Sequence, residues 1–571
     1  MNSETTFRLA ESTAVEPLVN SWFAWSNAIS PLPASLHLTH YQLPLMESYL
    51  SEPAIHVEAR KNPQLMGGPF IDIPVEKRDR IRALLEKTKN ELSASVTWAN
   101  EIFQLCNRLV KEAQGQSLEP FYRSLPSSLR GYVELVYDYH HRPSVRFIEA
   151  LLYKTEYYRP VLQSFRLYNV GSDDARPFFL NTPRIEENGA IDWPVHFEDA
   201  RVDEFFSLAL IPKRLGYIRE LLGTPIEIDD QRLKSFFTER PRKPCERWDE
   251  SRVRYRYFGH ACVLMQYKGV SILVDPFIAL RPAGGGEERF SYDDLPDHID
   301  YVLVTHNHLD HFNPEVLLRL RAQIGAIVVP GSFGALYGDM SLKLLLQKIG
   351  FRHVIEVDSF DTIDIPGGEI IAIPFLGEHS DLLHAKTAYV VRTGSRQTLF
   401  AADSDCLDKE IYVNVKKHLG QIDTLFLGME CEGAPVSYGY GSLFPQKIRR
   451  DYDETRRQRG CDAVRGWDIA SSLGANRVYN YAMGLEPWTR YILGLSLGDK
   501  SPQWQESEKL VRRIQQTNGA VAKRLYSKDE VIVNDQPDNR FSIVPVPSEV
   551  IPRITRADRR AFRAQAAELP H

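Results

Sequence analysis

The spacing of hydrophobic residues along the chain changes near residue 250. Before that point, apolar residues recur at intervals of three and four, which is the pattern of amphipathic helices. The expected helices cover residues 75–90, 94–113, 132–158 and 204–222. Residues 1–70 show little periodicity, and residues 189–193 are typical of a hairpin tip. Residues 1–245 are therefore predicted to form a mixed, largely helical N-terminal domain.

Short strand-like runs dominate after a basic, proline-containing stretch at residues 240–244, which we expect to be a solvated linker. Strands are expected at residues 253–258, 262–267, 270–274, 301–304, 326–329, 370–374, 387–391, 398–402, 424–427, 531–533 and 541–546. Helices are expected at residues 314–323, 341–349, 447–457, 467–473 and 502–516. This mixture predicts an α/β domain at residues 246–571, with sheets covered by helices and a C-terminal helical extension.

The densest group of metal-ligand side chains follows one of these strands. The segment at residues 305–311 reads THNHLDH and holds three imidazoles and one carboxylate. Residues two apart point the same way in an extended chain, so His306 and His308 can share one metal ion. Asp310 and His311 lie beyond a turn and can reach a second ion. An asparagine–proline pair directly after the segment is typical of a helix start. We interpret the segment as a dinuclear metal site.

Aspartates at the ends of other strands can complete this site. Asp403 follows the apolar run at residues 398–402, where a carboxylate could bridge two metal ions. Asp405 is a nearby competitor, but a helical run follows it and favours a role as a helix cap. Asp275 could hold a ligating imidazole by its free N–H, although a turn-forming aspartate before a proline explains it equally well.

Glu378 and His379 leave the chemistry of the metal site open. They are adjacent in what is expected to be extended chain, so their side chains point apart and only one is expected to ligate. With His379 the site is rich in nitrogen and suits zinc. With Glu378 it has a third carboxylate beside Asp310 and Asp403, and harder oxygen ligands suit iron or manganese.

Two further residues have an open role. Glu430 follows the strand at residues 424–427 and is a candidate catalytic proton carrier or a support for the metal ligands. A structural carboxylate is an equal alternative. His260, in the stretch FGHA at residues 258–261, is likewise either part of the metal site or a structural residue, and the sequence favours neither.

Composition narrows the class of protein and its partners. The chain has 571 residues, of which 43% are hydrophobic and 25% charged, as in an ordinary globular protein. Its net charge of −6 gives no basic surface for nucleic acid. No apolar stretch approaches the roughly 20 residues that span a bilayer, and the first residues lack the pattern of a signal peptide. The six cysteines form no CxxC pair. We therefore expect a cytoplasmic protein with reduced thiols and no membrane partner.

Three segments resemble the metallo-β-lactamase fold superfamily. They are the HxHxDH motif at residues 306–311, FGHA at residues 258–261 and ILVDP at residues 272–276. The resemblance implies an αβ/βα sandwich with a dinuclear site between two sheets. Hydrolases of this superfamily normally supply a further histidine after the strand that follows the bridging aspartate. Residues 427–435 contain Glu430 and Glu432 but no histidine, so the hydrolase ligand set is incomplete.

A narrower resemblance fits this departure. The chain is similar to the diiron aminoacyl β-hydroxylases of chloramphenicol biosynthesis and related nonribosomal peptide pathways, which also place a large domain before a metallo-β-lactamase domain. Residues 377–379 are also similar to that group. The resemblance implies a ligand set of His306, His308 and Glu378 on one iron, Asp310 and His311 on the other, and Asp403 as the bridge.

The same resemblance implies a reaction and partners. It indicates a monooxygenase that uses two iron ions and O2 to hydroxylate an amino acid held as a thioester on a peptidyl carrier domain. An external electron donor is implied, as are a homodimer and an N-terminal domain that recognises the carrier. Because carriers are commonly acidic, a basic surface is needed; the region of Arg142, Arg146 and Lys154 is a candidate, although a solvated helix face explains it better.

Two other classes of function compete with this interpretation. The first is a dinuclear zinc hydrolase of phosphodiesters or lactones, which uses a metal-bound hydroxide as nucleophile. The missing later histidine argues against it, and the choice between Glu378 and His379 as ligand would decide. The second is a non-catalytic scaffold, which has no need of an intact HxHxDH motif.

Overall fold

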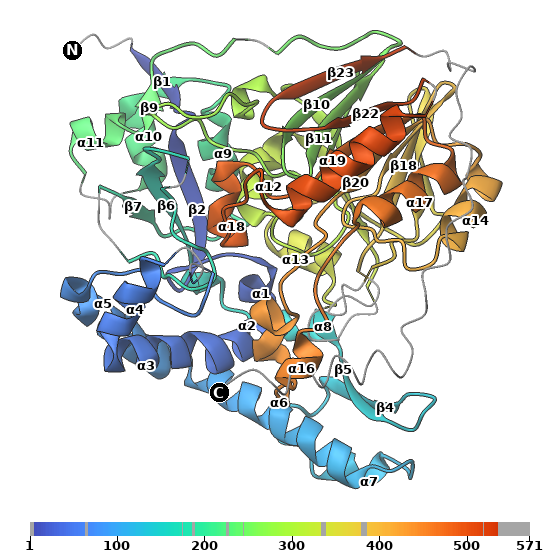
Figure 1. Ribbon diagram of the computed structural model, residues 1–571. Helices are drawn as coiled ribbons and strands as arrows, with labels where there is room; N and C mark the ends of the chain where they lie inside the picture. The colour runs from blue at the N-terminus through green and yellow to red at the C-terminus, as the bar shows by residue number, and fades with distance from the viewer. Residues whose placement is uncertain are drawn as a thin grey trace.

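Two seven-stranded sheets lie against each other in the upper right part of Figure 1, with the N-terminal elements to their left and below. The structure is a computed structural model that describes residues 5–534, apart from residues 63–64, 66, 174, 186–188, 224–227, 244, 333–338, 378–384 and 518. The predicted strand at residues 541–546 lies outside the described residues.

The first sheet has the strand order β15-β14-β13-β12-β11-β10-β23. Its strands are β10 (Val253–Gly259), β11 (Cys262–Tyr267), β12 (Val270–Val274), β13 (Ile299–Leu303), β14 (Ile324–Pro330), β15 (Val354–Val357) and β23 (Asp529–Val533). Strands β12 to β15 pair in parallel, and the remaining pairs are antiparallel. The carboxyl ends of the parallel strands therefore share one edge, which is where the loops after β12 and β13 meet.

The second sheet has the order β16-β17-β18-β19-β20-β21-β22. Its strands are β16 (Thr362–Ile365), β17 (Gly368–Ile373), β18 (Ala388–Thr393), β19 (Arg396–Phe400), β20 (Thr424–Gly428), β21 (Arg477–Tyr481) and β22 (Val521–Arg524). Pairs from β19 to β22 are parallel. The loops after β19 and β20 leave this sheet at its own shared edge.

Helices cover the outer face of each sheet. The covering helices are α12 (Pro314–Leu320) and α13 (Leu342–Lys348) on the first sheet, and α14 (Glu410–Leu419), α17 (Ala463–Leu473) and α19 (Pro502–Gln515) on the second. In β12, Ile272 and Val274 pack between the sheets while Leu273 packs under the helices. Strands buried on both faces have continuous apolar sequences, which explains why they were recognisable as strands. The predicted αβ/βα sandwich is confirmed.

The N-terminal part combines helices with small sheets. Its strands are β1 (Thr6–Leu9), β2 (Thr13–Val19), β3 (Trp22–Phe23), β4 (Val133–Tyr137), β5 (Pro143–Phe147), β6 (Gln163–Asn169), β7 (Ile191–Trp193), β8 (Lys213–Arg214) and β9 (Phe237–Thr238). Its helices are α1 (Ser26–Ile29), α2 (Pro31–His37), α3 (Leu43–Ser51), α4 (Pro53–Arg60), α5 (Arg78–Glu91), α6 (Ser93–Glu112), α7 (Glu119–Arg123), α8 (Glu149–Leu152), α9 (Ala200–Ser207), α10 (Leu215–Leu222) and α11 (Asp230–Lys234). Helices α5 and α6 match the predicted pair at residues 75–90 and 94–113.

Three of the predicted helices are not continuous helices in the structure. Residues 132–158 contain the β4–β5 hairpin and the short α8, because Val133 and Leu135 alternate with exposed residues at the period of a strand. Residues 204–222 hold the end of α9 and all of α10, separated by a break that contains Pro212. Residues 447–457 contain only the one-turn helix α16 (Arg450–Asp453).

The predicted linker is solvated over most of its described residues, since Arg240, Pro241 and Lys243 are exposed, but it is anchored at Arg242. The Arg242 side chain is buried and donates to the backbone oxygens of Asp293 and Leu295. One hydrophobic cluster also runs from Phe7 and Phe236 to Phe258. The N-terminal part and the sandwich therefore share a core, and the division near residue 245 stays a prediction.

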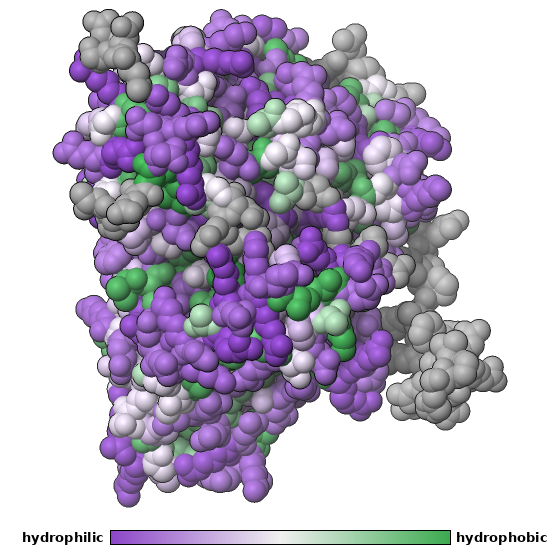
Figure 2. Space-filling model, turned by 90° about the vertical axis from the view of Figure 1, so that its left-hand side faces the viewer, coloured by the Kyte–Doolittle hydropathy of each residue, from purple (hydrophilic) through white to green (hydrophobic). Residues whose placement is uncertain are grey.

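The face of the molecule seen in Figure 2 is mostly hydrophilic, with hydrophobic side chains in small separate patches. Among the described residues, no helix is long and apolar enough to cross a membrane.

A buried ion network joins the N-terminal part to the sandwich. Arg176 lies 2.7 Å from Glu16 on β2 and 2.7 Å from Glu315 on α12, the helix that follows the metal-ligand loop. Burial alone would raise the pKa of Glu16, but Arg184 and Arg176 hold it at about 2. The Arg176 guanidinium also lies over the Tyr491 ring at 3.8 Å. A single buried cation thus holds elements from three parts of the chain.

We expect Arg176→Met to lower the free energy of unfolding by about 3–5 kcal/mol, because it leaves the buried Glu315 without its cation. Urea unfolding measures the change. The matched control is Arg123→Met, which removes an exposed pair with Glu119 and is expected to change stability by less than about 1 kcal/mol. Equal effects of the two variants would contradict the role given to Arg176.

Candidate metal centre

The loop between β13 and α12 carries the HxHxDH motif and is fixed at both ends. On one side, the backbone N–H of Thr387 donates to the Thr305 oxygen at 2.8 Å, which ties the loop to the second sheet. On the other side, the Asn313 side chain accepts from the backbone N–H of Glu315 and caps α12, as expected from its sequence. Between them, the N–H groups of His311 and Phe312 donate to the oxygen of His308 and form the turn that separates the two halves of the motif.

The first half of the motif meets Asp403. His306, His308 and Asp403 place one ligand atom each within 4.8 Å of one another. His306 Nε2 lies 3.2 Å from His308 Nδ1 and 3.5 Å from Asp403 Oδ2. Two imidazoles and a carboxylate directed at one point can hold a transition-metal ion.

The second half of the motif forms a neighbouring group. His260, Asp310 and His311 also place ligand atoms within 4.8 Å of one another. His260 Nε2 lies 2.8 Å from Asp310 Oδ2, and His311 Nε2 lies 3.8 Å from that same oxygen. His260, whose role the sequence left open, therefore belongs to the site, either as a ligand or as the group that orients Asp310.

Asp403 lies between the two groups. Its Oδ2 is 3.5 Å from His306 Nε2 and 3.2 Å from His311 Nε2, so one oxygen faces an imidazole from each half of the motif. It follows Ala402, which has a positive φ of 47°. The chain also needs Gly428 here, because a Cβ on that residue would lie 2.5 Å from the Ala402 oxygen and 3.0 Å from Asp403 Oδ1.

Asp275 organises the loop from behind. It is completely buried and accepts hydrogen bonds from the Thr305 backbone N–H at 2.7 Å, the Thr305 hydroxyl at 2.7 Å and His311 Nδ1 at 2.8 Å. The last of these bonds directs His311 Nε2 toward Asp403. Ligating histidines are commonly fixed in this way by a carboxylate on the other nitrogen.

Backbone strain concentrates around the same groups. Asp275, Ala402 and His260 have positive φ values of 41°, 47° and 48°, in the region that side chains other than glycine rarely adopt. Each such residue costs on the order of 1 kcal/mol. Strain of this kind is typical of functional sites whose geometry the surrounding fold imposes.

The electrostatics of the centre fit bound cations. Burial and the neighbouring His311 imidazole lower the pKa of His306 well below its ordinary value. Burial alone would also lower the pKa of His311, but Asp403, Asp310 and Asp275 together raise it far above normal. His311 Nε2 is buried and makes no hydrogen bond within the described part of the chain. Imidazoles and carboxylates are thus crowded in a desolvated space, and divalent cations would balance the excess negative charge.

Glu430 lies next to this excess charge. Burial, and then the charges of Asp403 and Asp310, raise the pKa of the Glu430 carboxyl well above its ordinary value. The backbone N–H of Gly460 donates to the backbone oxygen of Glu430 at 2.8 Å, which fixes the main chain at this residue. The sequence prediction that Glu430 accompanies the ligands is compatible with this position, and its catalytic role stays a prediction.

Asp405 is not the helix cap expected from the sequence. Helix α14 begins five residues later, and the buried Asp405 carboxylate pairs with Arg465 and accepts from the Cys406 N–H at 2.8 Å. The Asp405 N–H donates to the oxygen of Leu376 at 2.6 Å. Asp405 therefore joins the turn after Asp403 to the segment that leads to residue 378.

Residues 378 and 379 themselves lie outside the described residues. The choice between Glu378 and His379 as ligand therefore stays a prediction. The described residues on either side of this segment are Gly377 and Ala385, and the next residue, Lys386, pairs with His306 in an isolated β-bridge. The described chain beside the segment thus lies near the metal centre.

The N-terminal helices reach the centre through Tyr440. This residue is in α15 (Ser437–Tyr440), and its ring centroid is 5.8 Å from that of His308. It packs with Leu36 of α2 and Trp98 of α6 in one apolar cluster. No local sequence pattern indicates the packing of Tyr440 on these helices, because Leu36 and Trp98 are more than three hundred positions away from it.

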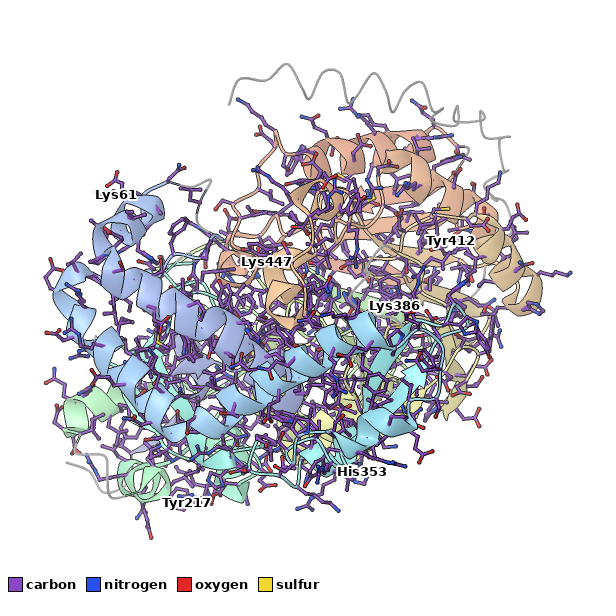
Figure 3. All side chains as sticks on the ribbon, turned by 90° about the horizontal axis from the view of Figure 1, so that it is seen from below. Lys61, Tyr217, His353, Lys386, Tyr412 and Lys447 are labelled. Carbon is purple, nitrogen blue, oxygen red and sulfur yellow. The ribbon has the colours of Figure 1, made fainter. Side chains whose placement is uncertain are left out.

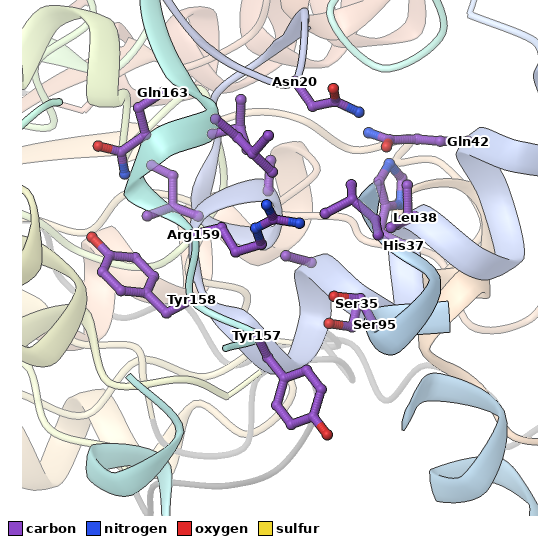
Figure 4. Close-up of a pocket in the computed structure, with 16 residues that line it drawn as sticks. Asn20, Ser35, His37, Leu38, Gln42, Ser95, Tyr157, Tyr158, Arg159 and Gln163 are labelled. Carbon is purple, nitrogen blue, oxygen red and sulfur yellow. The ribbon is translucent and has the colours of Figure 1, made fainter. Parts of the chain in front are cut away.

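A separate cavity in the N-terminal part is not a second reaction site. Figure 4 shows the polar groups of Asn20, Gln42 and His37 gathered on one side, with Arg159 entering from another. Burial lowers the pKa of His37 to about 3, so its ring is neutral. The cavity volume of about 60 Å³ has room for a few water molecules and none for an amino acid substrate.

Comparison with known proteins extends over most of the chain. Residues 8–241 match the diiron non-heme beta-hydroxylase N-terminal domain, and residues 254–392 match a beta-lactamase superfamily domain. The 4-amino-L-phenylalanyl-[CmlP-peptidyl-carrier-protein] 3-hydroxylase of Streptomyces venezuelae is 35% identical over 533 residues, covering 91% of this chain and 98% of that protein.

Solved structures give the same result. The crystal structure of CmlA, a diiron beta-hydroxylase from Streptomyces venezuelae, superposes with a TM-score of 0.84 at 34% identity, covering 93% of this chain and all of that one. A metal-dependent hydrolase of Methanopyrus kandleri is 31% identical over only 124 residues, which is 21% of this chain and 46% of that protein.

Replacing Asp275 tests the geometry of the centre. We expect Asp275→Asn to lower the affinity for metal about 10- to 100-fold, because the amide holds His311 in the wrong tautomer or orientation. Metal titration against a competing chelator measures the change. Asp300→Asn is the control, since Asp300 also accepts from a backbone N–H, that of Ser271, at the far end of β13. A normal metal affinity in Asp275→Asn would contradict this role.

Proposed function

The chain belongs to the family of diiron non-heme β-hydroxylases, and we propose that it hydroxylates the β-carbon of an amino acid held as a thioester on a peptidyl carrier domain. The single observation that supports the proposal most strongly is the pair of ligand groups that share Asp403. The substrate class is drawn from the Streptomyces relative, whose name specifies a carrier-bound amino acid and hydroxylation at carbon 3.

The proposed ligand assignment uses both groups and the adjacent loop. His306, His308 and Glu378 would hold one iron. Asp310 and His311 would hold the other, and Asp403 would be shared by both. Three carboxylates would offset three of the four positive charges of two ferrous ions. A ligand set with this many hard oxygen donors favours iron over zinc. Bound iron supplies the chemistry with O2 that replaces a hydrogen on carbon by a hydroxyl.

The surrounding residues orient and protect this centre. Asp275 fixes the His311 ring, and His260 orients the Asp310 carboxylate from 2.8 Å. Glu430 is proposed to carry a proton at its carboxyl or to support the metal ligands from beside Asp403 and Asp310. The Tyr440 ring lies beside the His308 ring at a centroid distance of 5.8 Å and forms part of the wall of the centre.

Partners beyond the carrier are also proposed. Reducing O2 while only one oxygen atom enters the substrate requires an electron pair, so an external electron donor must reach the protein. A homodimer and a cytoplasmic location complete the proposal; all six cysteines are free thiols, which agrees with a reducing compartment.

A hydrolase is the rejected alternative. The sequence similarity to the Methanopyrus hydrolase covers 21% of the chain, whereas the similarity to the Streptomyces hydroxylase covers 91% of it. Residues 427–435 also lack the later histidine of the hydrolase ligand set.

The neighbouring residues Glu378 and His379 provide a matched pair of variants. We expect Glu378→Ala to lose bound iron and hydroxylation, because it removes a carboxylate ligand, and His379→Ala to keep most of both. Metal analysis and intact mass of the carrier-bound product measure the two effects. Loss of metal in His379→Ala with retention in Glu378→Ala would reverse the ligand assignment.

Metal exchange tests the reaction class. Protein reconstituted with iron and supplied with O2 and a reductant is expected to add one oxygen atom to a carrier-bound amino acid. Protein loaded with zinc is expected to be inactive, because zinc has no redox chemistry. Full activity with zinc and none with iron would overturn the proposal.

A further inference from the structure

We propose that the groove between α6 and residues 444–456 is the docking surface for an acidic peptidyl carrier domain. The groove has a volume of about 490 Å³ and lies on the underside of the molecule, where Figure 3 shows Lys447 beside the helices of the N-terminal part. This inference rests on the proposed function and names the surface that such a substrate carrier would use.

The floor of the groove is apolar and open. Val110 on α6 and Tyr452 on α16 both line it and are 61% and 54% exposed, respectively. Phe444 and Ile448 add partly buried apolar surface on the same side. The two walls are joined by a hydrogen bond of 3.2 Å from Gln446 Nε2 to Asn107 Oδ1. An exposed apolar groove with polar edges is typical of a protein interaction site.

The rim of the groove is strongly basic on a chain that is acidic as a whole. Residues 446–459 contain six lysines and arginines against three carboxylates, whereas the whole chain has a net charge of −6. Lys447, Arg450 and Arg456 are exposed and have no carboxylate at ion-pair distance in the part of the chain that the structure describes. Cations that are not neutralised within the protein are available to an acidic partner, and they attract it at long range.

The other basic candidate lacks this excess charge. Residues 134–154, which include Arg142, Arg146 and Lys154, contain three cations and three carboxylates. Arg146 is paired with Glu134 across the β4–β5 hairpin at 2.8 Å. The hairpin is therefore close to neutral, and charge complementarity favours the groove.

The groove is directly connected to the metal centre. Asp453 on α16 accepts from the Ser437 backbone N–H at 3.0 Å and also pairs with the Ser437 hydroxyl. Ser437 begins α15, the helix whose Tyr440 ring lies 5.8 Å from the His308 ring. At the other end of the same segment, the backbone N–H of Gly460 donates a hydrogen bond to the backbone oxygen of Glu430. A carrier bound in the groove would therefore contact the segment of chain that covers the reacting centre.

Two charge-reversed variants with matched composition test the inference. The groove variant carries Lys447→Glu, Arg450→Glu and Arg456→Glu, and the hairpin variant carries Arg142→Glu, Arg146→Glu and Lys154→Glu. All six side chains are on the surface, so folding and iron content are expected to be normal in both. The probe is the CmlP peptidyl carrier protein loaded with 4-amino-L-phenylalanine, the substrate named for the Streptomyces relative.

We expect the groove variant to bind the carrier at least about tenfold more weakly and to raise KM with little change in kcat, since docking is lost and the centre is intact. The hairpin variant should stay within about twofold of the wild type. Carrier binding to the wild type should also weaken at high salt. Equal binding by the wild type and the groove variant would overturn the inference, as would a selective loss in the hairpin variant.

A second variant tests the apolar floor without changing charge. Tyr452→Ser is expected to weaken carrier binding severalfold and to leave iron content unchanged. Light scattering measures the oligomeric state of all variants. If the groove substitutions dissociate a dimer while carrier binding stays normal, the groove is an interface between copies of this chain and the inference is wrong. Absence of hydroxylation by the iron-loaded wild type would instead count against the proposed function, and the binding measurements remain a separate test of the groove.

Discussion

The centre depends on one buried carboxylate, Asp275. A carboxylate with no access to water is costly unless its oxygens accept hydrogen bonds, and burial accordingly raises the pKa of Asp275. The loop that carries the HxHxDH motif supplies those bonds, from the Thr305 N–H and hydroxyl and from the His311 ring. The need to satisfy this carboxylate therefore selects the loop conformation that directs the HxHxDH side chains toward Asp403.

The same logic explains why the strained residues are tolerated. His260, Asp275 and Ala402 each occupy an unfavourable backbone region, and each comes just after a strand that is buried except at Arg256. The apolar layer between the sheets and the helical layers outside them leave these turns no room to relax. Packing energy from the sandwich thus maintains a crowded set of imidazoles and carboxylates, whose mutual repulsion and desolvation a pair of cations would offset.

The sequence was most informative where local pattern and tertiary role coincide. The strands buried on both faces, the capped helix after the motif, and the ligand spacing at residues 306–311 depend on neighbouring residues, and they were predictable. The hairpin at β4–β5 was mistaken for a helix because its apolar residues satisfy both periods over a short stretch. Asp405 was mistaken for a cap because its true partner, Arg465, is sixty residues away. The contact of Tyr440 with His308 and the basic groove depend on long-range packing, which one sequence does not encode in any local pattern.

The segment from Glu430 to Gly460 gives the N-terminal part a physical role in the reaction. It leaves the second sheet beside Asp403, carries Tyr440 against both His308 and the N-terminal helices, and returns through the basic groove to bond Glu430 again. Tyr440 packs on its other side against an apolar cluster that includes Leu36 and Trp98 of the N-terminal helices. The N-terminal part therefore supports the residue that lies beside His308, and its packing and the position of the metal-ligand loop are linked through that one ring.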